Sequence, residues 1–381
     1  MKAATLEFLV QRFSAYYREE VIIPPSSLSQ REWGFIMFNT SGETRMRRHI
    51  GFGSSQEVGE YVQSFTPAHI YYSSAYYETP GAPTMDAKQW KGADLIFDLD
   101  ADHIVRGTYD IMLTRVREET IKLLAMLTDE LGFSEDLIEV VFSGGRGYHI
   151  HVKDPAVRGW GSAERREVID YVCGIGIDPG HVLAVRSPSP RGWRRRYIAA
   201  MSEYLSWLQG LPTEEAMAEI ERLDGVGEIA AERFLAAAPD MLEKIREGIP
   251  VNPNDRVIWP VIRSLTSAPD GAFATRLKQE AALADEPVTT DIKRLIRLPA
   301  SLHGGSGFRV TPLVPGELAD FDPLVDAVVF GEKGVMVDCS VKSSMKLLGN
   351  TYTLEKSTLT VPEALAVFLC CRGMAEISGG G

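Results

Sequence analysis

The chain has 381 residues, 45% of them hydrophobic and 24% charged, with a formal net charge of -12 at pH 7. This composition is typical of a globular protein with a main domain and one or two smaller ones, and the acidic balance argues against a protein that binds polyanions over its whole surface. No apolar run reaches membrane-spanning length, so we expect no membrane segment. Four scattered cysteines without CxxC spacing favour a reducing, cytoplasmic setting.

The N-terminal part alternates predicted helices and strands. The expected elements are a helix over 1–17, strands around 33–39 and 47–53, a helix near 57–64 and a strand near 69–74. A basic group is formed by Arg45, Arg47, Arg48 and His49, just before and at the start of the second strand. A group of this kind is more often a solvated face than a binding site.

The next motif is a short apolar strand, 95–97, that runs into the carboxylates Asp98 and Asp100. Because strand side chains alternate, both carboxylates project to the same side, where they repel each other unless a divalent cation lies between them. Two alternatives stay open: turn and capping chemistry, and the nucleophile motif of haloacid-dehalogenase-type phosphatases. The phosphatase reading needs further Ser/Thr, Lys and acidic groups that we do not find in a convincing order.

A long helix is predicted over 109–131, and strands at 138–143 and 147–152 then form a hairpin. Its turn is glycine-rich and allows a close backbone approach to a ligand. Ser143 supplies a hydroxyl, Arg146 a forked guanidinium for phosphate oxygens, and His149 and His151 share one strand face. The hairpin therefore predicts a polyphosphate site, with a purely structural hairpin as the alternative.

Residues 161–249 turn helical, which predicts a small helical domain beside an α/β core of residues 1–160 and 250–381. Its segment 180–196 contains no acidic residue and five arginines. The turn 223–227 is similar to a helix-hairpin-helix DNA-binding turn, but we interpret it as a plain helix–helix connector. Further on, a helix is expected at 272–284, strands at 327–330 and 334–339, and a closing helix at 362–371.

A third polar cluster spans 285–307 and contains Asp285, Arg297 and His303. Read alone it is a polar loop before a short helix. Together, the three clusters and their order resemble the catalytic small subunit of archaeal and eukaryotic DNA primase, and the likeness spans most of the chain. Arg31 and Glu32 resemble the family's N-terminal Arg-Glu strand, and 162–174 matches the helix after its hairpin.

The resemblance implies an α/β primase-type (archaeo-eukaryotic primase) catalytic core with mixed sheets flanked by helices, plus a small helical insertion domain. It implies that Asp98, Asp100 and Asp285 are the catalytic carboxylates that bind two Mg²⁺ or Mn²⁺ ions. The residues implied to line the triphosphate of the incoming nucleotide are Ser143, Arg146, His149, Arg297, His303 and Arg48. Glu32 is expected near this site.

Two departures from the family pattern matter. Family members commonly carry a zinc knuckle between the two first motifs, but residues 101–142 contain no cysteine, so we expect no zinc. Residues 304–307 lack the Lys-Thr pair that often follows the motif histidine. The resemblance assigns no role to segment 180–196, and a template-binding loop is one hypothesis for it. Asp102 and His103 are also left without a role.

The function implied is a DNA-directed primase of the nucleotidyltransferase class, which makes short primers on single-stranded DNA from NTPs or dNTPs for replication by a two-metal mechanism. The implied partner is a large primase subunit with an iron-sulfur cluster, forming a heterodimer, and an apolar patch on 327–339 is one place for it to dock. The rival readings are the phosphatase, a non-catalytic nucleic-acid-binding module, and primase-polymerases of repair or end joining.

Overall fold

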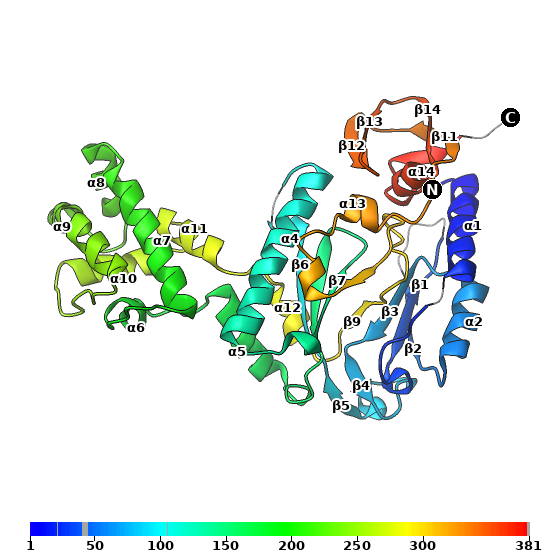
Figure 1. The fold of residues 1–381 in the computed structure, drawn as a ribbon, viewed down its shortest axis with the longest axis horizontal. Helices are drawn as coiled ribbons and strands as arrows, with labels where there is room; N and C mark the ends of the chain where they lie inside the picture. Colours follow the sequence, from blue (N-terminus) through cyan, green and yellow to red (C-terminus); the bar gives the residue numbers. More distant parts are fainter. Residues whose placement is uncertain (21, 40–44, 105, 379–381) are drawn as a thin grey trace. The chain divides into compact units, whose positions relative to one another are not determined.

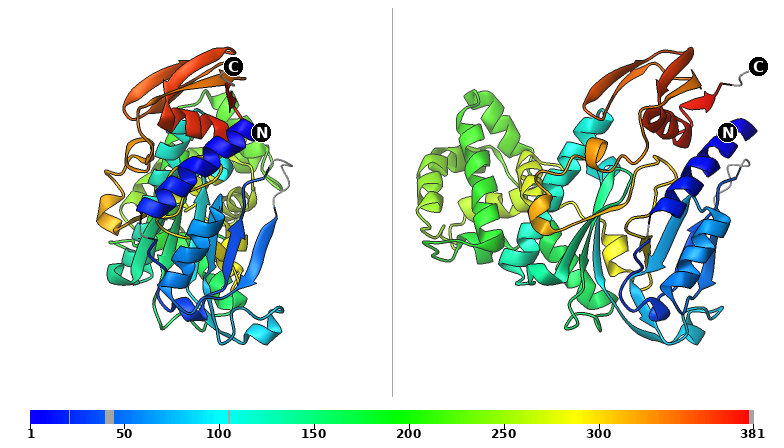
Figure 2. Two further views of the ribbon diagram at one scale, coloured as in Figure 1. Left: turned by 90° about the vertical axis from the view of Figure 1, so that its right-hand side faces the viewer. Right: turned by 45° about the vertical axis from the view of Figure 1, so that its right-hand side comes forward.

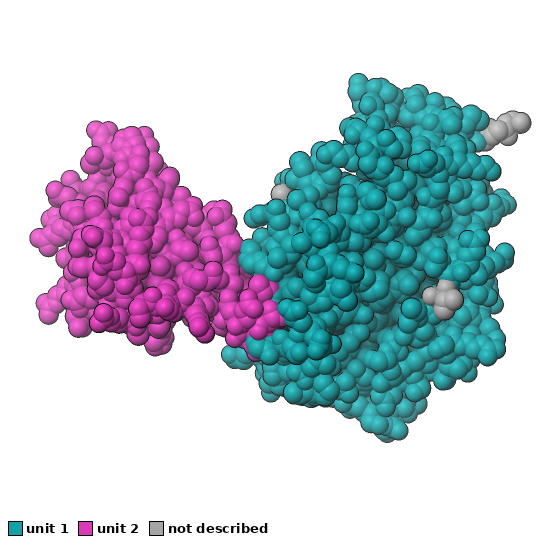
Figure 3. Space-filling model, in the orientation of Figure 1, with its two compact units in different colours: residues 1–124, 132–167, 283–381 teal, residues 125–131, 168–282 magenta. Residues whose placement is uncertain are grey.

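A computed structural model describes residues 1–20, 22–39, 45–104 and 106–378, His103 without its side chain. The chain divides into two compact units (Figure 3): unit 1, residues 1–124, 132–167 and 283–381, and unit 2, residues 125–131 and 168–282. The sequence placed the helical domain at 161–249. The observed unit extends to 282 because Trp259, Ile262 and Phe273 join the same apolar core as the helices before them.

The first sheet of unit 1 has the strand order β2-β1-β3-β9, and all of its strand pairs are antiparallel (Figure 1). Its strands are β1 (Trp33–Ile36), β2 (Met46–Ile50), β3 (His69–Ser73) and β9 (Leu295–Arg297). Helices α1 (Ala3–Glu19) and α2 (Ser55–Phe65) lie beside this sheet. The Phe35 ring of β1 packs 4.5 Å from the Tyr61 ring of α2, so the face toward the helices is apolar.

The second sheet has the order β10-β7-β8-β6 and is also antiparallel. It contains β6 (Leu95–Asp100), β7 (Ile138–Phe142), β8 (Gly147–Val152) and β10 (Thr311–Leu313). The hairpin of β7 and β8 was predicted from the sequence and is confirmed. Every residue of β8 is buried, because strand β8 lies between two neighbours and is covered on both faces.

The remaining elements of unit 1 connect or cover these sheets. They are β4 (Ala75–Tyr77), β5 (Trp90–Ala93), α3 (Ala101–Ile104), α4 (Tyr109–Ala125, which continues into unit 2 as a π-helical turn at Met126–Glu130), α5 (Ser162–Cys173, ending in unit 2), α12 (Glu286–Thr290) and α13 (Pro323–Asp326). The expected strand at 327–330 is wrong: Asp322 caps α13, and the chain then forms a turn without a strand partner.

The C-terminal part of unit 1 forms a small sheet, β14-β11-β15, and a separate hairpin of β12 and β13 (Figure 2). Its elements are β11 (Gly334–Cys339), β12 (Ser343–Leu347), β13 (Asn350–Leu354), β14 (Thr358–Pro362), α14 (Glu363–Cys371) and β15 (Ala375–Ile377). Of these, β11 and α14 were predicted from the sequence. Helix α14 is buried for most of its length and packs against α1.

Unit 2 is helical, with α6 (Pro179–Leu183), α7 (Gly192–Gln209), α8 (Thr213–Glu221), α9 (Glu228–Arg246), α10 (Ile258–Ser267) and α11 (Ala272–Glu280). The α/β core and the helical insertion that the sequence predicted are both confirmed. Among the described residues, no helix is both long and apolar enough to cross a membrane.

Candidate active site

The first two carboxylates lie at the end of β6. The first three residues of this strand are apolar and buried. Asp98 and Asp100 alternate with buried Leu99, so the two carboxylates point to the same, partly open side. Strand β8 pairs Asp98 with His149 and Asp100 with Gly147. The His149 Nε2 atom lies 3.4 Å from Asp98 Oδ1, with the Asp98 side chain 24% exposed. Asp98 and Asp100 therefore lie on one side of the strand, as the sequence predicted.

Tertiary structure brings the third carboxylate to the same place. The backbone N–H of Asp285 donates a hydrogen bond to the carbonyl oxygen of Asp98 at 2.8 Å. Asp285 is the N-cap of α12, and its carboxylate makes no capping hydrogen bond. Residues 98 and 285 are thus neighbours in space, although 187 positions separate them in the sequence.

These three carboxylates supply the donor chemistry that a hard divalent cation prefers. Their backbones are adjacent, and Asp285 keeps its carboxylate out of the helix cap. Over the described part of the chain, no three His, Cys, Asp or Glu side chains are already gathered into a ligand set. The fit to a metal ion therefore rests on carboxylate chemistry and backbone proximity.

The glycine-rich turn of the β7–β8 hairpin lies against the loop that carries His303. Gly144 has φ +74°, and a Cβ there would be only 2.7 Å from the Cβ of His303. A Cβ on Gly147 would enter the van der Waals radius of the Leu99 carbonyl oxygen on β6. Glycine is therefore needed at both positions, for the turn and for the close approach of β6 to the hairpin.

The two other candidate groups of the hairpin are arranged differently. Ser143 is 5% exposed, and its Oγ accepts a hydrogen bond from the Gly145 N–H at 3.3 Å. The Arg146 guanidinium forms an ion pair with Asp102, the residue to which the sequence gave no role. Both side chains of this pair are partly exposed. Arg146 therefore lies at the opening of the site, next to the end of β6.

Histidines and Arg297 form the inner part of the site, between the two sheets. His303 and His69 pack edge to face with ring centroids 4.9 Å apart, and the Gly304 N–H points to His69 Nδ1 at 3.4 Å. Burial lowers the pKa of His69 to about 3, and Arg297 lowers it further. Burial also lowers the pKa of His149 and, more strongly, that of His303.

Positive charge at neutral pH therefore comes from arginines, while the imidazoles are neutral hydrogen-bonding groups. Arg297 contributes to the lowered pKa of all three histidines, which places its charge near each of them. Two buried atoms, His149 Nδ1 and Arg297 Nε, have no hydrogen-bond partner among the described residues. Unpartnered polar atoms at one place are consistent with a polar ligand.

Arg48 lies apart from this group. It is on β2, at the edge of the first sheet opposite β9, with β1 and β3 between them. Its Nε and Nη2 donate to the carboxylate of Glu32 at 3.1 and 3.3 Å. Glu32 is fully buried and also lies 3.6 Å from the buried Lys88 ammonium. Glu32 and Arg48, each expected at or near the site, therefore form an ion pair beside the first sheet.

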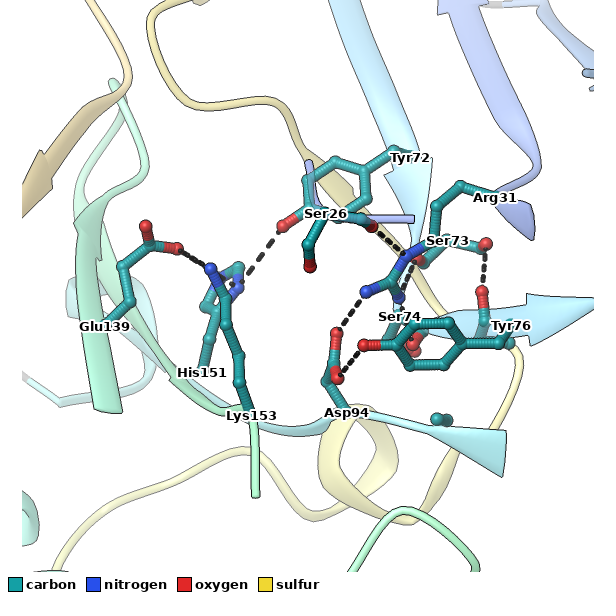
Figure 4. Close-up of polar contacts among 12 residues, drawn as sticks. Ser26, Arg31, Tyr72, Ser73, Ser74, Tyr76, Asp94, Glu139, His151 and Lys153 are labelled. Carbon is teal, nitrogen blue, oxygen red and sulfur yellow. Dashed lines mark hydrogen bonds and ion pairs between the residues drawn. The ribbon is translucent and has the colours of Figure 1, made fainter. Parts of the chain in front are cut away.

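A buried polar network ties the two sheets of unit 1 together (Figure 4). The Arg31 guanidinium donates to Asp94 Oδ2 at 2.7 Å and to the carbonyl oxygens of Ser73 and Ser74 at the end of β3. Asp94, just before β6, also accepts from the Tyr76 hydroxyl at 2.7 Å. These bonds fix the start of β6, the strand of the carboxylates, to the end of β3.

A second contact in the same region crosses between the sheets farther along the strands. The Tyr72 hydroxyl of β3 lies 3.4 Å from His151 Nδ1 of β8 (Figure 4). The His151 ring stacks on that of His149, with centroids 6.0 Å apart. His151 therefore supports His149 from behind and links it to the first sheet.

Sequence reasoning missed three residues of this region. His69 carried no motif, and Arg372 at the end of α14 lies far along the chain, yet both contribute to the lowered pKa of His303. Asp102 was noticed but left without a partner. Its position two residues after Asp100 is the only signal that favoured a place in the site, and the side chain of its neighbour His103 lies outside the described residues.

Known proteins resemble this chain over its whole length. A family model described as DNA primase small subunit matches residues 97–315, which include β6, the hairpin and the third cluster. A protein called DNA primase small subunit PriS from Methanosphaerula palustris is 54% identical over the full length of both chains. The proteins of the same name from Methanoregula boonei and Methanosarcina acetivorans are 56% and 40% identical, each covering 99% of this chain and 100% and 97% of their own.

The chain therefore belongs to the DNA primase small subunit family, as its sequence motifs indicated. Family membership makes it a primase of DNA replication and removes the phosphatase reading.

Proposed function

We propose that the chain is the catalytic subunit of a template-directed nucleotidyltransferase that makes short primers on single-stranded DNA. The observation that carries this proposal is the junction of Asp98, Asp100 and Asp285 beside a hairpin that presents Ser143 and Arg146. Carboxylates next to arginines and neutral hydrogen-bond donors suit a reaction in which a nucleoside triphosphate is bound and cleaved.

In this proposal Asp98, Asp100 and Asp285 hold two Mg²⁺ or Mn²⁺ ions, and no zinc takes part. When bound, such ions lower the pKa of the attacking 3′-hydroxyl and stabilise the pyrophosphate that leaves. The Nε2 atom of His149 lies against Asp98 and orients that carboxylate. The Nδ1 atom of the same ring has no hydrogen-bond partner among the described residues. The ring of His151 behind it limits the rotation of His149.

The triphosphate of the incoming NTP or dNTP contacts Arg146, Ser143, His149, Arg297 and His303. Arginine provides the charge, because burial keeps the histidine rings neutral at neutral pH. We keep Arg48 as a further proposed contact of the nucleotide, although it lies apart from these residues, on β2, in an ion pair with buried Glu32.

The names of the relatives call each of them a small subunit. We propose by analogy that this chain also pairs with a large primase subunit, as the sequence resemblance implied, and that it works in the cytoplasm. The segment 327–339 stays the proposed place to look for that partner, with Met336 of β11 half-exposed as its apolar centre.

The test is primer synthesis on circular single-stranded DNA with labelled NTPs or dNTPs and either Mg²⁺ or Mn²⁺. We expect D98A and D285A to abolish synthesis and to keep the unfolding temperature of the wild type. The matched control is D320A, which removes an exposed carboxylate of unit 1 and should leave synthesis unchanged. Primer synthesis by folded D98A would overturn the proposal.

A further inference from the structure

The turn at 223–227 in unit 2, interpreted from the sequence as a plain connector, borders a cavity. Helix α8 ends at Glu221, Gly225 takes φ +72°, and α9 begins at Glu228. The cavity has a volume of about 530 Å³, and its lining includes Val226, Ile229, Val257 and Pro260 together with Arg233 and Arg256. A connector that only joins two helices needs no such space.

Two cationic side chains from different parts of unit 2 reach this cavity. Arg233 comes from α9, and Arg256 from the loop before α10. Within the residues that the structure describes, neither side chain forms an ion pair or a hydrogen bond. Two cations near the same helices do form ion pairs: Arg222 lies 3.4 Å from Glu219, and Lys244 lies 2.6 Å from Asp240. Unneutralised arginines on an acidic chain point to an anionic ligand.

The turn adds backbone donors to the same cavity. Gly227 is the N-cap of α9 and has no side chain with which to cap it, so the first amides of the helix have no side-chain acceptor. A Cβ on Gly225 or Gly227 would meet no atom within 4 Å, so the turn is open to a large ligand. Glu228 also lines the cavity, and its carboxylate opposes an anion there.

We propose that this cavity binds the sugar-phosphate backbone of a DNA strand, with a phosphate between Arg233 and Arg256 and the sugar against the apolar floor. The choice of DNA as the source of the phosphate rests on the proposed function, whereas the phosphate chemistry rests on the two arginines. Unit 2 then holds the template independently of the carboxylates of unit 1.

The experiment measures binding of a fluorescein-labelled oligothymidylate to the full chain by anisotropy, without nucleotide or divalent metal. The double variant R233S/R256S should bind about tenfold more weakly, and the slope of log K against log salt should fall by about 0.7, the contribution of one phosphate contact on a single strand. The matched control K244S/R246S removes the same charge at the far end of α9 and should bind as the wild type does.

Equal affinity of R233S/R256S and the wild type, or an equal loss in the control, would overturn the proposal. Binding of inorganic phosphate by the wild type but not by R233S/R256S, with equal oligonucleotide affinity in both proteins, would show a free-anion site and overturn the assignment to DNA. Because the assay needs no catalysis, a failure here leaves the test of Asp98 untouched, and synthesis by D98A would not affect this result.

A second pair of variants tests the backbone donor. Both E228A and E228P remove the opposing carboxylate, but only the proline also removes an amide N–H, at a first-turn position where proline fits a helix. We expect E228A to bind the oligonucleotide more tightly than the wild type and E228P to bind it several-fold more weakly than E228A. Equal binding by the two variants would contradict a role for the turn.

Discussion

The Arg146 guanidinium is held by the carboxylate of Asp102, which lies two residues beyond Asp100 on the same edge of the site. An incoming triphosphate that binds Arg146 has to displace this carboxylate. Both side chains are partly exposed, so the pair contributes at most about 1 kcal/mol.

We therefore expect D102N to lower the KM for nucleotide by about two- to fivefold, which corresponds to that free energy, with kcat little changed. The measurement is steady-state primer extension at varied nucleotide concentration. A rise in KM for D102N would show instead that Asp102 orients Arg146 for the substrate.

Gly147 tests the close approach between the hairpin and β6. We expect G147A to destabilise the fold by about 1–3 kcal/mol or more and to abolish synthesis, because its methyl group would press on the backbone of Leu99. The control is G159A, where an added Cβ meets no atom within 4 Å. Urea unfolding of both variants measures the difference, and similar midpoints for the two would contradict this packing.

The Arg31–Asp94 pair tests the link between the sheets. Both side chains are almost fully buried, so removing one leaves an unpaired buried charge. We expect D94L to lower the free energy of unfolding by about 3–5 kcal/mol, and R31M/D94L to cost clearly less than the sum of the single variants. Chemical unfolding of the four proteins gives the coupling free energy, and additive losses would mean that the two residues act separately.

The pH dependence of stability tests His69. Above about pH 6.5 its imidazole is neutral in both the folded and the unfolded chain, so it contributes nothing to the pH dependence. Below that pH the imidazole of His69 binds a proton in the unfolded chain, whereas in the folded chain it stays neutral down to about pH 3. Stability therefore falls with decreasing pH across this window, at up to about 1.4 kcal/mol per pH unit for this histidine.

We expect H69Q to reduce this slope between about pH 6 and 4 by close to one proton, as measured from urea midpoints at each pH. The control is H181Q, since His181 is 90% exposed. An unchanged slope in H69Q would show that the imidazole takes up its proton in the folded chain as well.

The sequence by itself determined the local parts of the site. Alternation along β6 placed Asp98 and Asp100 on one side, and the glycines at 144 and 147 marked the hairpin, because such features depend on residues only a few positions apart. The same reasoning found β3, β11, α1 and α14. It also gave a strand at 327–330 that does not exist, because an apolar run cannot reveal whether a partner strand is present.

Only the tertiary structure decided which of these parts meet. It placed Asp285 beside Asp98, His69 against His303, and Arg372 near the same imidazole. It also extended the helical unit to residue 282 and opened the cavity beside the turn at 223–227. Such contacts join residues far apart in the chain, and they arise from how whole sheets and helices bury their apolar faces, which no short stretch of sequence encodes.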